Sequence, residues 1–115
     1  MSVTEPATFD ICVSTPPPPP ANDNCAGAIA LTVNPDYLCG SVTSGAVQSA
    51  TASGISSTCG GTPDDDVWFS FVATSTQHRI SILNAAGSVT DMYHALFTGG
   101  CGGLTLVSGS CSDAN

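Results

Sequence analysis

The stretch VWFSFVAT, residues 67–74, is the strongest strand signal in this chain of 115 residues. Val67, Phe69, Phe71 and Ala73 occupy alternate positions, so they share one face of an extended segment. β-branched and aromatic residues of this kind are enriched in strands. The stretch therefore predicts a β-strand with one apolar face.

Shorter segments on both sides of it have the same character, and clusters of Gly, Asn, Asp and Ser separate them. No helix longer than one turn is expected, although Asp23 or Asn24 could cap a single turn. Many short strands with such separators predict an all-β fold, a jelly-roll-like β-sandwich over residues 21–115. The further predicted strands are residues 29–33, 40–52, 77–84, 91–98 and 104–108.

The front of the chain has a different organisation from this body. Residues 1–15 form an arm with a strand-like centre at residues 8–14. Five consecutive prolines at residues 16–20 follow, which predict a stiff polyproline II spacer of ~15 Å at ~3.1 Å per residue. The two faces of the arm strand are Phe9, Ile11 and Val13 on one side and Asp10 and Cys12 on the other.

A lone strand must pair with something to satisfy its backbone groups. The arm is either a disordered tail, a strand that folds back onto its own sheet, or a strand donated to a neighbouring chain. Donation supplies main-chain hydrogen bonds and alternating side-chain contacts. A head-to-tail contact that does not close produces a filament.

The cysteines are even in number and none belongs to a Cys-x-x-Cys pair. This pattern predicts disulfides, and hence an extracellular or cell-surface location. Zinc is not expected, because neither His78 nor His94 lies near a pair of suitably spaced ligands. The six cysteines are Cys12, Cys25, Cys39, Cys59, Cys101 and Cys111.

Six cysteines allow fifteen connectivities, which spacing narrows. Cys101 and Cys111 flank a hairpin-like span, and Cys25 and Cys39 bracket the first strand, so each couple is a predicted pair. The remaining two are Cys12 and Cys59. They form an intrachain bridge, stay as free thiols, or join Cys12 of one subunit to Cys59 of the next.

The charge balance excludes several partners. The formal net charge is −8, with Arg79 the only strong cation and no lysine. Nucleic acid is not an expected partner, because one arginine is too little positive charge to neutralise a row of phosphates. No apolar run approaches the ~20 residues of a membrane span, so membrane insertion is not expected. The N-terminus lacks signal-peptide features, which indicates a mature chain or a piece of a longer one.

Asp64, Asp65 and Asp66 are the densest charge run and a candidate calcium site, with Asp91 or Asp113 as further oxygen donors. The run lacks the Asp-x-Asp-x-Asp-Gly spacing of a calcium loop, and a solvated turn before a strand explains it more simply. No other cofactor is expected.

Enzyme activity is not expected either. His78 and His94 alternate with apolar residues, which is typical of polar groups at the edge of a core. No Gly-x-Ser-x-Gly elbow is present. The glycines of residues 99–103 predict a turn, because neither a lysine nor a helix follows them. The aromatic residues that a glycan-binding face would use are Trp68, Tyr37 and Tyr93.

Three segments carry a family resemblance: PPPPPANDNCAGAIALTV (16–33), CGGTPDDDVWFSFVATSTQHRISI (59–82) and DMYHALFTGGCGGLTLVSGSCSDAN (91–115). Together they resemble a repeat module of secreted Bacteroidetes surface proteins, similar to bacterial pre-peptidase C-terminal domains. The resemblance implies a jelly-roll β-sandwich that accompanies secreted proteases and large adhesins, many of them exported by the type IX secretion system. It also implies an accessory, noncatalytic role, and it too pairs Cys101 with Cys111.

In such modules the chain continues past the equivalent of Cys111 and ends in a strand resembling TFDICVSTPPPPP, which here stands at residues 8–20. The resemblance thus implies a body with an open groove and an arm of the matching kind, or a fragment of a tandem array. The prediction is a structural subunit or repeat of an extracellular filament or adhesin, which assembles with copies of itself. Phe9, Ile11, Cys12 and Val13 form its assembly strand. The alternative is a noncatalytic carbohydrate- or ligand-binding accessory module of a secreted enzyme.

Overall fold

The computed structural model describes residues 5–55, 64–88 and 91–114. Within these ranges there is no α-helix, and each strand is only two or three residues long. The predicted mostly-β character is therefore confirmed. The elements are η1, a 3₁₀ turn (Cys25–Gly27), β1 (Ile29–Ala30), β2 (Phe69–Ser70), β3 (Met92–His94), β4 (Phe97–Thr98), β5 (Thr105–Leu106) and β6 (Ser112–Ala114).

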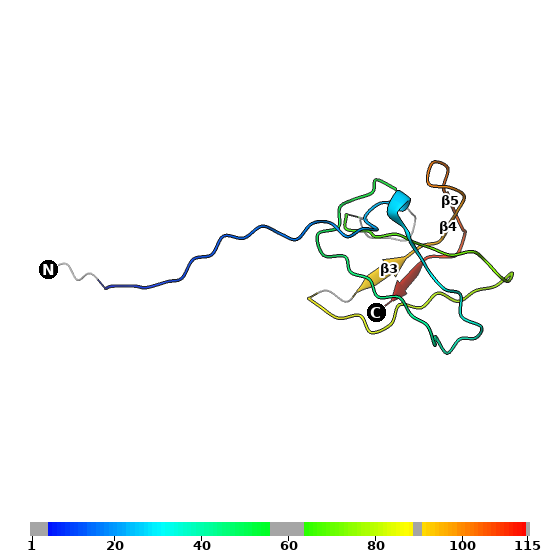
Figure 1. Ribbon diagram of the computed structural model, residues 1–115, viewed down its shortest axis with the longest axis horizontal. Helices are drawn as coiled ribbons and strands as arrows, with labels where there is room; N and C mark the ends of the chain where they lie inside the picture. The colour runs from blue at the N-terminus through cyan, green and yellow to red at the C-terminus, as the bar shows by residue number, and fades with distance from the viewer. Residues whose placement is uncertain (1–4, 56–63, 89–90, 115) are drawn as a thin grey trace.

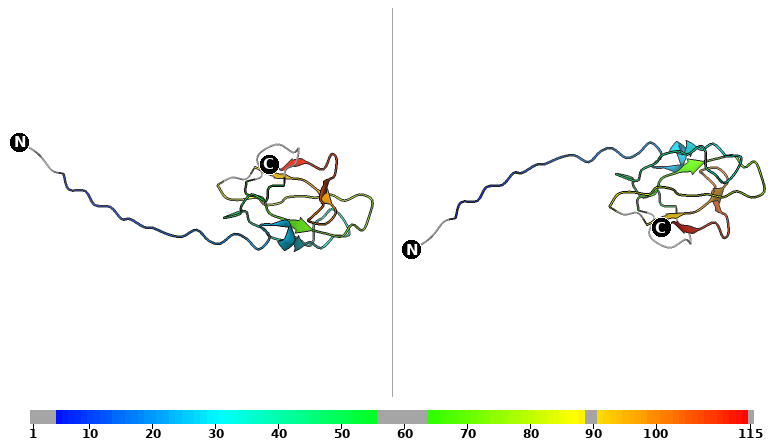
Figure 2. Two further views of the ribbon diagram at one scale, coloured as in Figure 1. Left: turned by 90° about the horizontal axis from the view of Figure 1, so that it is seen from above. Right: turned by 90° about the horizontal axis from the view of Figure 1, so that it is seen from below.

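The strands form three separate two-stranded sheets (Figure 1). β1 pairs in parallel with β2, so that Ile29 lies opposite Phe69. β3 pairs antiparallel with β6, and β4 with β5. In both views of Figure 2, the β1–β2 pair and the β3–β6 pair lie on opposite sides of the body.

The segment that leads into β1 is anchored to the start of β2. The Asn22 carbonyl accepts a hydrogen bond from the Trp68 N–H at 2.8 Å, and the Asn22 side-chain amide donates to the Trp68 carbonyl at 2.9 Å. Beyond them, the Leu31 N–H donates to the Ser70 carbonyl at 2.7 Å. Asn22 is buried because its polar groups find these partners on the neighbouring segment.

Two carboxylates hold the segment around residues 51–53 against the sheet. Asp23 accepts hydrogen bonds from the Thr51 N–H and hydroxyl, both at 2.6 Å. Asp66 accepts from the Ser53 N–H at 3.0 Å and also from the Ser53 hydroxyl. The strand pair expected over residues 40–52 is absent, since side chains take the place of a strand partner here.

The strand expected over residues 77–84 is also absent. The His78 imidazole Nε2 accepts hydrogen bonds from the N–H groups of Thr74 and Ser75, at 3.0 and 3.2 Å. These contacts close a tight turn after β2, so that the two segments do not pair as a regular hairpin. The single turn expected near residue 24 is confirmed as η1. Asn24 occupies its N-cap position without a side-chain cap.

No apolar side chain is fully buried in the part of the chain that the structure describes. The apolar side chains of the interior are only half-buried. Trp68 and Phe97 are examples, and their ring centroids lie 5.7 Å apart. A closed sandwich interdigitates the inner faces of two sheets into a continuous core. The described body has small sheets and an open interior in place of that packing.

Candidate functional site

The arm is the most exposed apolar segment of the molecule. Phe9, Ile11 and Val13 are 82%, 87% and 96% exposed. Figure 1 shows the arm running away from the body rather than folding back onto it, and the molecule measures 81 × 32 × 24 Å. No hydrogen bond joins residues 5–15 to the rest of the described chain. The arm therefore holds an apolar face that its own body does not cover.

The prolines explain why the arm stands clear. Proline fixes φ near −65° and has no N–H to donate, so five in succession favour polyproline II over any turn. Residues 16–20 are free of turns and strands in the structure. The first local contact comes at the end of the run, where the Pro20 carbonyl accepts from the Asp23 N–H at 3.1 Å. The chain thus turns into the body only after the last proline.

The body presents an open groove with a volume of about 750 Å³, which we call the Tyr37 groove. It opens where segments from all three sheets meet: Phe71 follows β2, His94 lies on β3, and Val107 follows β5. Among the described residues that line it, none carries a formal charge at neutral pH. Its apolar and aromatic lining comprises Tyr37, Phe71, Ile80, His94, Leu96 and Val107.

A second open groove of about 420 Å³ lies beyond β1 and β2 and is lined by Leu31, Val33 and Val72, among others. Phe71 lines both grooves, so they adjoin at this ring. Val72, which lines the smaller groove, is 82% exposed. The two grooves together leave the apolar side chains that follow β1 and β2 uncovered.

A compact loop over residues 34–41 carries Tyr37, which lines the groove. Asn34 and Ser41 close it reciprocally: the Asn34 side-chain amide donates to the Ser41 carbonyl and the Ser41 N–H donates to Asn34 Oδ1, both at 2.8 Å. The guanidinium of Arg79 lies 5.5 Å from the centroid of the Tyr37 ring, a cation–π contact. The loop is therefore held in place although Tyr37 itself is 67% exposed.

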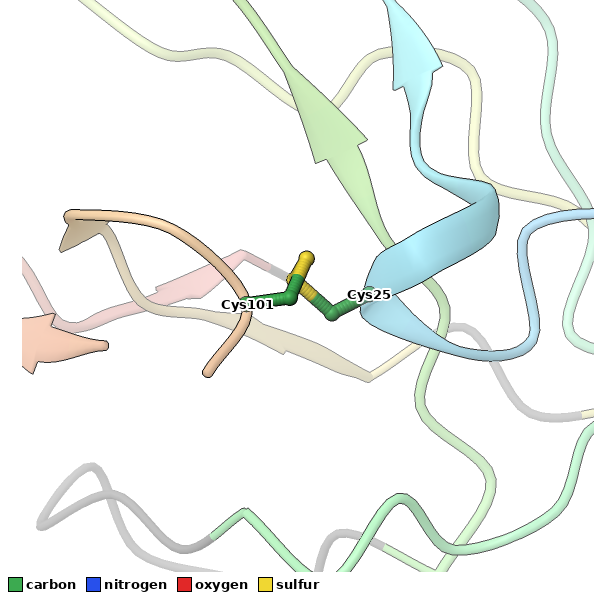
Figure 3. Close-up of a disulfide and its surroundings, with 2 residues drawn as sticks. All are labelled: Cys25 and Cys101. Carbon is green, nitrogen blue, oxygen red and sulfur yellow. A yellow bond between two sulfur atoms is a disulfide. The ribbon is translucent and has the colours of Figure 1, made fainter. Parts of the chain in front are cut away.

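The cysteine pairings expected from spacing are wrong. Cys25 bonds to Cys101, with Cα atoms 5.7 Å apart, rather than to Cys39 (Figure 3). The β4–β5 hairpin brings its loop, which carries Cys101, to the side of η1, whereas Cys39 lies on the separate loop of residues 34–41. Cys111 is itself in a disulfide.

Spacing had assigned no partner to Cys12 and Cys59. In the structure Cys12 is a free thiol on the exposed arm. Cys59 lies outside the described residues. Cys39, expected to be bridged, is free and partly exposed. The described chain therefore carries one free thiol on the arm and one on the body.

Both histidines line the Tyr37 groove. Burial lowers the pKa of His94 below its ordinary value of 6.5, so its imidazole is neutral at pH 7. His78 packs edge-on against Phe71, with centroids 5.6 Å apart, and its Nε2 accepts two backbone hydrogen bonds. A hydrolytic triad needs a free imidazole nitrogen and a carboxylate to orient the ring. No carboxylate lies among the described lining residues, so the groove lacks that constellation.

The acidic run does not gather into a metal site. Asp64 and Asp65 are exposed, and the carboxylate of Asp66 is engaged by Ser53. Within the described ranges, no group of three His, Cys, Asp or Glu side chains is placed to hold a metal ion. Asp64 and Asp65 lie in a bend that precedes β2.

The three rings expected of a glycan-binding face are not brought together. Tyr37 lines the larger groove, Trp68 packs against Phe97, and Tyr93 lies on β3, 48% exposed. The glycine-rich stretch at residues 99–103 is the loop of the β4–β5 hairpin, as expected. Its first glycine, Gly99, has φ +97°, which an L side chain rarely adopts.

Sequence reasoning missed the roles of Asn22 and Asp23 as buried anchors. A signal was present, because Asn and Asp that immediately precede a strand often hydrogen-bond to nearby backbone. It also missed the free state of Cys39.

No family model, curated protein or solved structure matches this chain. None of the described helical segments is long and apolar enough to cross a membrane.

Proposed function

We propose that this chain is a structural subunit or repeat of an extracellular filament or adhesin, and that it assembles head to tail. The arm of one copy enters the Tyr37 groove of the next. There Phe9, Ile11 and Val13 face the apolar lining. With this strand added, the body becomes a jelly-roll-like sandwich of the kind that its resemblance to pre-peptidase C-terminal modules implies.

The main support for the proposal is that the arm and the body each leave apolar side chains uncovered. The arm has three apolar side chains that are at least 82% exposed. The body has an open groove whose uncharged lining includes Phe71, Ile80, Leu96 and Val107 beside polar side chains, and its described residues include no fully buried apolar side chain. Monomeric soluble proteins rarely leave such apolar surface uncovered without a partner. Because both surfaces belong to one chain, a second copy supplies each with its complement.

The expected free energies show which contacts would stabilise the joint between two copies. Full burial of three side chains of this kind contributes roughly 5–9 kcal/mol in total. Association costs about 4–15 kcal/mol in lost freedom. Apolar burial alone therefore does not secure the joint, and the backbone hydrogen bonds of the donated strand, at about 0.5–1.5 kcal/mol each, supply the remainder. Loss of a single apolar arm residue should weaken assembly strongly.

Two further features support a location outside the cytoplasm and a soluble surface. The disulfide between Cys25 and Cys101 is of a kind that persists in oxidising compartments. The net charge of −8 keeps the surface soluble.

The test is a pair of matched arm variants. Val13→Asp places a charge on the apolar face of the strand, whereas Ser14→Asp places the same charge on the opposite face. We expect Val13→Asp to leave the chain monomeric in light scattering and Ser14→Asp to assemble like the unaltered chain. Deletion of residues 1–15 should also give a monomer. Assembly of the deleted chain would refute strand donation, and a monomeric unaltered chain that binds polysaccharide would favour the accessory-module alternative.

A further inference from the structure

The described chain carries two free cysteines, and they lie on the two surfaces that strand donation brings together. Cys12 is exposed at the centre of the arm. Cys39 lies on the loop of residues 34–41, two positions after Tyr37, which lines the groove. The other described cysteines, Cys25, Cys101 and Cys111, are all in disulfides. The two free thiols among the described residues therefore lie one on the arm and one on the loop that carries Tyr37.

We infer that Cys12 of one copy forms a disulfide with Cys39 of the next copy, which locks each donated arm in place. The inference rests on the strand donation proposed above. It names the residues that meet at the joint, and it makes the assembly a covalent polymer.

The alternation of the arm is consistent with this bond. With Phe9, Ile11 and Val13 facing into the groove, Cys12 points to the opposite side, towards the rim. Cys39 lies two positions after Tyr37, which lines the groove, and the paired bonds between Asn34 and Ser41 close the loop that carries both residues. A disulfide needs Cα atoms about 4.4–6.8 Å apart, so the donated arm has to pass beside this loop.

Cys12 and Cys39 of one chain are not bonded to each other in the structure. The arm points away from its own body, and the five prolines at residues 16–20 keep it there (Figure 1). A neighbouring copy has no such constraint.

The bond forms by thiol–disulfide exchange with a small disulfide such as oxidised glutathione. The Cys12 thiolate attacks one sulfur of that molecule, forms a mixed disulfide and releases one glutathione thiol. The Cys39 thiolate of the next copy then attacks the Cys12 sulfur and releases the second. The two cysteines lose two electrons and two protons, and one small disulfide is reduced to two thiols.

The experiment compares the full chain with its Cys12→Ser and Cys39→Ser variants after incubation with oxidised glutathione. Free thiols are then alkylated, and the samples run on denaturing gels with and without reductant. We expect the unaltered chain to give a ladder of multimers that collapses on reduction. Each variant should stop at dimers or monomers, while still assembling without covalent bonds in light scattering.

Isotope mixing identifies the bond. Equal amounts of unlabelled and ¹⁵N-labelled chain are assembled, oxidised and digested with pepsin, because a chain with one arginine and no lysine yields few tryptic peptides. We expect peptides that join Cys12 to Cys39, about half of them carrying one labelled and one unlabelled partner. Cross-linked peptides without mixed labels would show an intrachain bond and overturn the inference.

The two proposals fail in different ways. If the unaltered chain assembles in light scattering but gives no reducible ladder, the disulfide is wrong and strand donation stands. If the chain without residues 1–15 still assembles, strand donation is wrong and the disulfide falls with it. A ladder that persists in the Cys39→Ser variant would overturn the disulfide alone.

Discussion

At the scale of single residues, Asp23 links the pH dependence of the fold to one pair of contacts. Its carboxylate accepts hydrogen bonds from the hydroxyl and the N–H of Thr51, and both hold its pKa below the ordinary value of 3.8. A carboxyl whose pKa is lowered by folding stabilises the folded state at every pH above its unfolded value. That contribution is lost as the pH falls from about 3.8 through the lower folded value.

We therefore expect Asp23→Asn to lower the melting temperature by several degrees at pH 7. The difference from the unaltered chain should shrink as the pH falls below 3.8. Thermal unfolding followed by circular dichroism between pH 2 and 7 measures both effects. Asp64→Asn is the matched control, because Asp64 is exposed, and it should leave the melting temperature unchanged. A difference that grows towards acid pH would contradict this role for Asp23.

Gly27, the last residue of η1, is a second position where stability depends on a single atom, because the fold leaves no room for a Cβ there. A Cβ built there would lie 2.2 Å from the carbonyl oxygen of Ala21, a backbone atom that cannot rotate away. We expect Gly27→Ala to destabilise the body by about 1–3 kcal/mol, as overpacking does. Gly100→Ala is the control, since nothing lies within 4 Å of a Cβ at that position. Equal urea midpoints for the two variants would show that the chain can shift at Ala21 without cost.

At the scale of elements, the disulfide between Cys25 and Cys101 ties η1 to the loop of the β4–β5 hairpin. It joins residues 76 positions apart, and so it restricts the unfolded chain strongly. We expect the double variant Cys25→Ser/Cys101→Ser to lose about 2–5 kcal/mol of unfolding free energy in urea titrations.

The double variant Cys12→Ser/Cys39→Ser serves as the control for that measurement. Both of its cysteines are free in the isolated chain, so its unfolding free energy should equal that of the unaltered monomer. A comparable loss of stability in this control would mean that removal of a thiol, rather than of the bridge, is what destabilises the body.

The positions of the strands could be predicted from the sequence better than their partners. β1, β2 and β5 fall inside segments with alternating or compact apolar residues, and the single turn η1 was expected near Asn24. Their parallel and antiparallel pairing depends on contacts between distant residues, such as Asn22 with Trp68. The disulfides also depend on contacts between distant residues. Sequence spacing predicted Cys39 as the partner of Cys25, whereas the β4–β5 hairpin places Cys101 beside Cys25 in the structure.

The two halves of the candidate site also differed in how well they could be predicted. The apolar face of the arm follows directly from alternation at Phe9, Ile11 and Val13. The Tyr37 groove does not, because its lining comes from segments near every sheet. Similarly, the acidic run at residues 64–66 suggested oxygen ligands, yet Asp66 takes Ser53 as its partner.

At the scale of the whole molecule, the proposed assembly makes the arm of one copy a ligand for the body of the next. The described contacts within the body do not involve residues 5–15, so the body should remain folded when the arm is deleted. A ligand that binds only the folded state raises stability by RT ln(1 + [L]/Kd), which is about 2.7 kcal/mol at a concentration of 100 Kd. A free arm peptide should therefore stabilise the deleted body in a concentration-dependent way.

We expect a synthetic peptide of residues 5–15 to raise the melting temperature of the chain lacking residues 1–15, and the shift should grow with peptide concentration. The control peptide carries Ile11→Asp and Val13→Asp, which place charges on the face that enters the groove, and it should give no shift. Because the peptide lacks a body, it cannot propagate a filament, so the measurement isolates one joint. If both peptides shift the melting temperature equally, binding does not depend on the apolar face of the arm. If neither does, the open interior of the body has another occupant.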